Sequence, residues 1–315
     1  MKYSFYDNTS AFAQLLITGL VMLVTLVAGF AVVMGAVLIF SDMPFGEYAR
    51  IMSDINSPQG VAAMRIMQII QSLALFIIPS FLIAWYFSAQ KAAYLSLKKV
   101  HLKILLAGGL MLLLAGPFIN LSGALNESVK LPESLKSIED WMRFKEDAAK
   151  NIIEKFLMDG RYHILLYNIF LIAILPAVGE ELIFRGVLQN IFVKWTGNIH
   201  AGIIITGLLF SFIHFQFYGF FPRALLGILF GYLLYWSGSI WVPIFAHFVN
   251  NAISVVFYFF IARGRLDMSD AELGAGQGEW MFAVISLILA IAVGSYIYKE
   301  CRSLRPVNLD AESSI

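Results

Sequence analysis

Long uncharged apolar stretches alternate with shorter polar segments along the whole chain. The first stretch, 11–40, contains no charged side chain. It is longer than the apolar part of a signal peptide and long enough to span a bilayer with some tilt. The pattern predicts about eight transmembrane helices and therefore an all-α, polytopic helical membrane protein. The expected ranges are 11–40, 66–87, 104–125, 162–183, 199–218, 223–237, 240–261 and 280–298.

The amino-acid composition supports this fold class and argues against one class of partner. Hydrophobic residues make up 59% of the chain and charged residues 14%, whereas a soluble domain has about 25% charged residues. The net charge of +1 is uninformative, and the lack of a basic stripe argues against nucleic acid as a partner. Cys301 is the one cysteine and is expected in a polar tail, so an intramolecular disulfide is excluded.

The polar segment 88–103 predicts the orientation in the membrane. Its charged side chains are all lysines, Lys91, Lys98, Lys99 and Lys103. The positive-inside rule places such a loop in the cytoplasm, and counting helices from it puts both termini there. We expect the inner (cytoplasmic) membrane of a bacterium. The 41–62 loop is then outside, and its acids outnumber its one arginine; these residues are Asp42, Glu47, Asp54 and Arg50.

The longest polar stretch, 126–161, mixes both charge signs, and apolar residues recur in it with a nearly helical period. It predicts an amphipathic helix beginning near Pro132 and Ser134. That helix could lie on the membrane and guard an entrance, or be a solvated connector. We divide the chain into 1–160 (three transmembrane helices and the amphipathic connector), 161–262 (the next four apolar helices) and 263–315 (a last helix and a polar tail).

Ionisable side chains inside apolar spans are costly and are functional candidates by default. They cluster late in this chain, at Glu180-Glu181 with Arg185, at Phe210 with His214, and at His247 with Asn251. Glu181 and Arg185 are four residues apart, so on a helix they share a face and predict an ion pair. Glu180 points elsewhere around the same helix and is free for another partner.

Chain spacing predicts that three of these residues lie at one depth. Glu180 and His214 are nearly equidistant from the turn at 195–198, so an antiparallel helix pair would bring them level. The length of the next helix places His247 in the same layer, with Asn251 one turn further on.

A carboxylate, two imidazoles and a carboxamide in one layer suit peptide hydrolysis. Glu180 would take a proton from water, with His214 holding that water. His247 and Asn251 would donate hydrogen bonds to an oxyanion. No cofactor is expected, although Glu180, His214 and His247 could instead bind zinc. The sequence has neither a His-Glu-x-x-His nor a Gly-x-Ser-x-Gly motif.

The ordered set Glu180-Glu181-x-x-x-Arg185, Phe210-x-x-x-His214 and His247-x-x-x-Asn251 resembles the CPBP family (CAAX proteases and bacteriocin-processing enzymes, also called Abi). The resemblance covers about 160–262. It implies intramembrane proteolysis, with Glu180 as catalytic glutamate, His214 as its partner on the water, and His247 and Asn251 as the oxyanion site. It assigns Glu181 and Arg185 a supporting role.

Three functions remain open from sequence. The first is a glutamate-dependent intramembrane endopeptidase whose peptide or protein substrate can be membrane-bound or lipidated. The second is a non-proteolytic immunity or scaffold protein of the same fold. The third is a proton-coupled transporter, which is disfavoured because transporters often show inverted repeats and here the polar cluster occupies one half of the chain only.

Overall fold

A computed structural model describes residues 9–40, 44–54, 56–267, 273–276 and 278–303. Asp42 of the predicted outer loop and the polar tail from 304 onward lie outside these residues. Within the described ranges the regular structure is entirely helical, and seven helices are long and apolar enough to cross a membrane. This confirms a polytopic helical membrane protein.

Each predicted apolar range is helical, and the eighth helix is the short α11. The bounds are α1 (Ala11–Phe40), α3 and α4 (Pro58–Phe87 with a π-helical turn), α6 (Leu102–Glu127), α8 to α10 (Tyr162–Thr196), α11 (Ile199–Phe212), α12 (Phe220–Ser237), α13 (Trp241–Ala262) and α15 (Trp280–Ser303). Short helices α2 (Phe45–Ser53) and α5 (Lys91–Tyr94) lie in the loops.

Two expectations about helix ends are wrong. The range 199–218 ends as a helix at Phe212, because Phe215 adopts a left-handed backbone (φ 51°) that a helix cannot continue through. His214 consequently lies in the loop after α11. Cys301 is not in a polar tail: it is buried in the last turn of α15, because the apolar face of that helix continues to its end.

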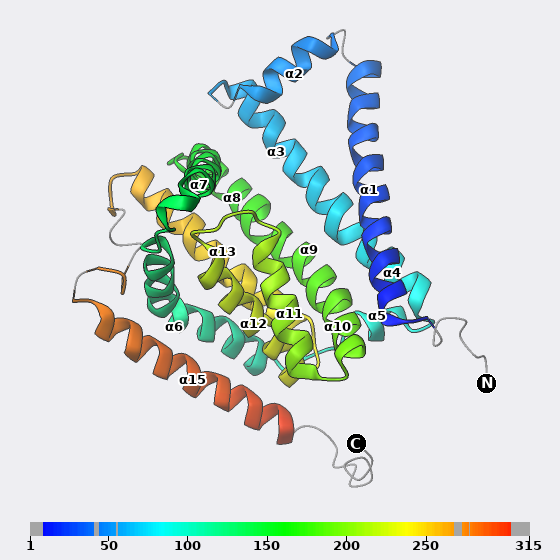
Figure 1. Ribbon diagram of the computed structural model, residues 1–315, viewed down its shortest axis with the longest axis vertical. Coiled ribbons are helices and arrows are strands. Elements are labelled where there is room, and N and C mark those ends of the chain that lie inside the picture. Colours follow the sequence, from blue (N-terminus) through cyan, green and yellow to red (C-terminus); the bar gives the residue numbers. More distant parts are fainter. Residues whose placement is uncertain (1–8, 41–43, 55, 268–272, 277, 304–315) are drawn as a thin grey trace.

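The molecule consists of an arm and a body (Figure 1). The arm is α1 to α4, in which α1 and α3 diverge toward the upper end of the view. The body is α6 to α15, with α9 to α13 at its centre. Helix α7 (Lys136–Leu157) is seen end-on while the other long helices are seen from the side, so it runs across them at the upper end.

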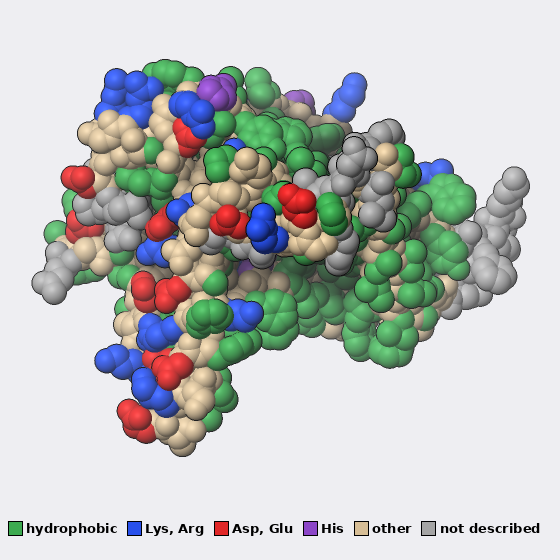
Figure 2. Space-filling view, turned by 90° about the horizontal axis from the view of Figure 1, so that it is seen from above, with side chains coloured by type: hydrophobic (Ala, Val, Ile, Leu, Met, Phe, Trp, Pro, Cys, Tyr) green, Lys and Arg blue, Asp and Glu red, His purple; other side chains and the backbone are tan. Residues whose placement is uncertain are grey.

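The start of α1 and the short α5 lie near each other at the right of the view, and the end of α15 lies at the bottom (Figure 1). There Lys103 pairs with Glu300, and Lys194 donates to the Thr9 carbonyl. At the upper end, charged side chains gather over the projecting α7, while hydrophobic side chains cover much of the arm (Figure 2). Both ends of the described chain therefore lie in the lower half of the view.

The helix from Tyr162 to Thr196 is interrupted twice by π-helical turns, Ile169–Ile174 and Phe184–Leu188, on either side of α9 (Leu175–Ile183). The first turn precedes Pro176, whose ring cannot donate a backbone hydrogen bond. Gly179 lets the α3–α4 helix approach α9, because an added Cβ would meet the Phe76 Cβ at 3.1 Å. The fold thus positions α9 against both arm and body.

Candidate active site

A buried ion pair anchors the site to the body. Glu181 and Arg185 have fully buried side chains, and Arg185 Nη1 lies 3.0 Å from Glu181 Oε1. Arg185 Nη2 donates to the Gly227 carbonyl of α12 at 2.8 Å, and the guanidinium lies 4.7 Å from the Phe210 ring centroid. The predicted pair is therefore present, and it also ties α9 to α11 and α12.

Glu181 has a second partner that the sequence interpretation missed. His247 Nδ1 lies 2.9 Å from Glu181 Oε1, and the imidazole stacks on Phe230 with ring centroids 4.8 Å apart. A carboxylate only accepts hydrogen bonds, so Nδ1 carries the proton. Glu181 therefore fixes the ring orientation of His247 and directs its Nε2 toward the neighbouring Glu180. In the sequence, the adjacency of Glu180 and Glu181 is the feature that could have indicated this contact with His247.

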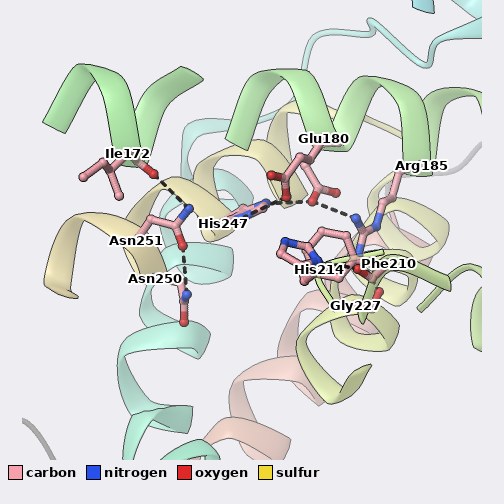
Figure 3. A network of polar contacts seen from close by, with 10 residues as sticks. Ile172, Glu180, Arg185, Phe210, His214, Gly227, His247, Asn250 and Asn251 are labelled. Atoms are coloured by element: carbon pink, nitrogen blue, oxygen red, sulfur yellow. Dashed lines mark hydrogen bonds and ion pairs between the residues drawn. The ribbon is translucent and has the colours of Figure 1, made fainter. Parts of the chain in front are cut away.

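Glu180 lies next to His247, near its Nε2 atom (Figure 3). Its Oε2 lies 3.9 Å from His247 Nε2, and its side chain keeps 13% of its surface exposed.

His214 reaches the site from the loop after α11. Its Nδ1 lies 2.7 Å from the Phe210 carbonyl, which can only accept, so Nδ1 carries the hydrogen. In the neutral ring Nε2 then has a free lone pair. The Phe210 ring lies between the two imidazoles, with centroids 5.2 Å from His214 and 5.9 Å from His247.

Asn251 lies to one side of this cluster. Its Nδ2 donates to the Ile172 carbonyl at 3.3 Å and its Oδ1 accepts from Asn250. In Figure 3 the amide points along α13 toward Ile172 rather than toward Glu180. The structure thus brings Glu180, His214 and His247 together and leaves Asn251 one helical turn away, bonded to backbone.

Glu180 and His214 open into one cavity of about 870 Å³ between the arm and the body. The body contributes Pro176, Phe184 and Ile213 beside them, and α7 contributes Ile152 and Phe156. The amphipathic α7 is therefore a wall of the cavity. The arm supplies much of the rest, namely Leu15, Thr18, Gly19, Met22, Met52, Met64, Met67, Gln68, Gln71, Ser72, Leu75 and Phe76. The sequence interpretation gave no role to the arm, because it carries no motif.

Contacts from α6 and α7 hold the loop that carries His214. The buried Asn126 of α6 donates to the Phe217 carbonyl at 3.0 Å and accepts from the Phe221 N–H at 2.7 Å. Glu146 of α7 accepts from the Tyr218 N–H at 3.3 Å, and burial there raises the pKa of the Glu146 carboxyl. These contacts fix the end of the loop that leads into α12.

The donor set does not form a metal site in this geometry. Among the described residues, no group of three or more His, Cys, Asp and Glu side chains is arranged to hold a metal ion. His247 Nδ1 bonds Glu181 and His214 Nδ1 bonds the Phe210 carbonyl, which leaves Nε2 of each ring available. The zinc alternative therefore stays a prediction.

Comparison with known proteins identifies the part of the chain that holds the site. Residues 162–253 match the family model of type II CAAX prenyl endopeptidase Rce1-like proteins. The chain is 31% identical over 90 residues to "Uncharacterized protein YpbD" of Bacillus subtilis (strain 168), covering 27% of this chain and 43% of that protein. It is 27% identical over 101 residues to "Putative membrane peptidase YdiL" of the same organism, covering 32% and 41%.

The matched stretches thus span less than half the length of these relatives. No solved structure matches the chain. The family match is to proteases, and it contains all six predicted site residues, from Glu180 to Asn251. The resemblance inferred from the three motifs is therefore confirmed: residues 162–253 form an Rce1-like segment of an integral membrane protein.

Proposed function

We propose that the protein is a glutamate-dependent intramembrane endopeptidase. The observation that carries this proposal is that Glu180 and His214 open into one cavity among apolar helices, while His247 lies 3.9 Å from Glu180. The buried Glu181–Arg185 pair fixes that histidine from behind. Such rigid support is what a preorganised site requires.

In the first step, a water molecule lies between the Glu180 carboxylate and the free Nε2 of His214. Glu180 accepts one proton of this water, and His214 accepts a hydrogen bond from the other and orients the oxygen. The water oxygen bonds to the carbonyl carbon of the peptide, and the carbonyl π electrons move to its oxygen.

The resulting oxyanion is stabilised by hydrogen-bond donors. His247, when it carries a proton on Nε2, is one such donor. Asn251, released from Ile172, supplies the second donor. Glu180 then delivers its proton to the leaving nitrogen as the carbon–nitrogen bond breaks, and one peptide becomes a carboxylic acid and an amine.

The lysine-rich end with α5 is proposed to face the cytoplasm of a bacterium, so that both termini lie inside. With this orientation, α7 and the His214 loop lie on the outer side of the inner membrane. The substrate is proposed to be a peptide or protein segment that reaches the cavity from the membrane or from that side, with or without a lipid anchor.

Two variants test the proposal, Glu180→Gln and His214→Ala, with Glu133→Gln as the matched control. Glu133 is an exposed carboxylate in the turn before α7. Peptides are compared by mass spectrometry of membranes expressing each form. General acid–base residues contribute about 10²–10⁴-fold in rate, so products of the wild-type protein should disappear in both variants and persist in the control. Unchanged processing in both folded variants would refute the protease proposal and favour a scaffold.

An experiment with a zinc chelator distinguishes direct activation of water by Glu180 from activation of water by a bound metal. Purified protein treated with a zinc chelator should keep its hydrolytic activity if Glu180 activates water directly. Loss of activity that returns with added zinc would instead support metal binding by Glu180, His214 and His247.

A further inference from the structure

Two amide side chains of α3 (Pro58–Ser72) line the cavity opposite the body. Gln68 and Gln71 lie on the same stretch of this helix, and both border the space that Glu180 and His214 open into. Neither amide makes a hydrogen bond within the described part of the chain. Each therefore presents an unused donor and an unused acceptor to the cavity.

This differs from the use of amides elsewhere in the helices. Gln14 donates to the Thr9 carbonyl, Asn168 to the Phe156 carbonyl and Gln189 to the Gly231 carbonyl. Gln68 is half-buried and Gln71 is exposed, so both amides are open to the cavity rather than enclosed by packing. The two glutamines of α3 are therefore available to a partner that enters the cavity.

The wall that carries them is fixed at both ends. Toward the lower end, α3 and its continuation contact α9 at Gly179. Toward the upper end, Arg65 donates to the Phe156 carbonyl of α7 at 3.3 Å and lies over the rings of Phe156 and Tyr167. Gln68 and Gln71 thus face the body across a set distance.

A peptide segment that is to be cut must be extended, and its backbone N–H and C=O groups then lack helical partners. Inside a membrane each such group must be satisfied by the protein. Helical residues three apart have Cβ atoms about 5–6 Å apart. Residues i and i+2 of an extended strand are about 6.6 Å apart and offer both groups to the same edge.

We propose that Gln68 and Gln71 form a backbone-binding subsite that holds an extended apolar peptide segment beside Glu180. The inference rests on the proposed function and names its substrate class. Each glutamine amide donates to one backbone carbonyl and accepts from one backbone N–H of the segment. On this side of the cavity the protein contacts the peptide backbone of the segment, so binding there does not depend on the amino-acid sequence of the segment.

The side chains around the two glutamines fit this form of recognition. Met22, Met52, Met64 and Met67 border the same cavity. Methionine is unbranched and polarizable, so its side chain adapts to partners of different shape. The cavity thus combines fixed backbone partners with an adaptable apolar surface for the side chains of the segment.

The test measures peptide binding in a protein that cannot cut. The probe is a fluorescent ten-residue peptide of alternating Leu and Ala, with a second version N-methylated on alternate residues. Binding is measured by anisotropy for Glu180→Gln in lipid nanodiscs. It is repeated after adding Gln68→Met and Gln71→Met, or Gln14→Met as the control, since Gln14 is a bonded amide outside the cavity.

We expect N-methylation to weaken binding about tenfold or more for the protein with both glutamines, since one hydrogen bond corresponds to roughly tenfold in affinity. The Gln14→Met protein should behave in the same way. The Gln68→Met/Gln71→Met protein should bind both peptides equally and weakly. Equal loss on N-methylation in every protein, or no binding of the plain peptide, would overturn the subsite.

The two proposals fail in different ways. Backbone-dependent binding without cleavage by the wild-type protein would leave the subsite in place and remove the peptidase function. Cleavage that depends on Glu180 and is unaffected by the glutamine substitutions in KM would remove the subsite alone.

Discussion

Helix α1 of the arm and the helices of the body line one cavity but are packed very differently. The other long arm helix, α3–α4, has 33% of its most apolar window buried and resembles the body in this respect. In α1 the most apolar window has 0% of its residues buried, whereas the corresponding window of α6 in the body has 39%. Large side chains of α1 such as Leu23 and Val27 are more than half exposed. In the body, Ile183 and Arg185 on either side of Phe184 are completely buried.

This difference in packing corresponds to two different structural requirements. The proposed chemistry needs Glu180, His214 and His247 fixed to within fractions of an ångström, and dense packing achieves this. A wall that admits a substrate needs to separate from the body at low cost, and α1, with few buried side chains, can do so while α3 stays fixed at both ends. In the proposed mechanism the body positions the reacting groups, and α1 is the movable part of the cover.

The largest expected effect is in the core of the body. Arg185→Met leaves the buried Glu181 carboxylate without its guanidinium, so we expect a loss of about 3–5 kcal/mol in the free energy of unfolding. The measurement is denaturant unfolding in mixed micelles. Glu181→Met added to Arg185→Met should recover part of the loss, since no unpaired charge remains. A loss below about 1 kcal/mol for the single variant would show that the body is not rigid at this point.

Substituting one glycine in the body and one in α1 should produce a smaller difference in stability. A Cβ on Gly227 of α12 would lie 2.9 Å from the Gly207 Cα and 3.0 Å from its carbonyl oxygen, so α11 and α12 would have to separate. We expect Gly227→Ala to cost about 1–3 kcal/mol. A Cβ on Gly19 of α1 would meet nothing within 4 Å.

Gly19→Ala should be neutral or slightly stabilising, because alanine favours a helix by about 1 kcal/mol over glycine. Thermal unfolding of the two variants side by side provides the comparison. Similar losses in both would contradict the contrast between a loosely packed α1 and a dense body.

The smallest effects are expected on α7, where two carboxylates respond to pH in opposite senses. The side-chain hydrogen bond from Arg143 lowers the pKa of Glu139, whereas burial raises the pKa of Glu146. Glu139 therefore stabilises the fold above the usual titration range of glutamate and loses this contribution as the pH falls through its lowered pKa. Glu146 stabilises the fold only while it is protonated, and this contribution is lost as the pH rises through its raised pKa.

Accordingly, Glu139→Gln should lower the unfolding midpoint at neutral pH, and Glu146→Gln should raise it slightly. Both differences should shrink at a pH below the titration range of each carboxyl. Midpoints measured across the acid range provide the check, and a Glu146→Gln variant that is less stable at neutral pH would contradict the assignment.

The apolar pattern predicted the helices because bilayer burial depends on hydrophobicity alone. Equal distances from a turn likewise predicted that Glu180 and His214 meet. The Glu181–His247 contact was not predictable, because it depends on the rotation of α9 between two π-helical turns. The position of Gln68 and Gln71 on the cavity was not predicted, because an uncharged amide changes the hydrophobicity of an apolar stretch only slightly.

The short α11 has a consequence for the surrounding lipid. Its 14 residues give a length of about 21 Å, while the hydrocarbon core of a bilayer is about 30 Å thick. The loop with His214 therefore ends below the level of the neighbouring headgroups, unless the bilayer thins beside it. Either arrangement shortens the path by which water reaches Glu180, so hydrolysis should become slower in membranes of longer acyl chains.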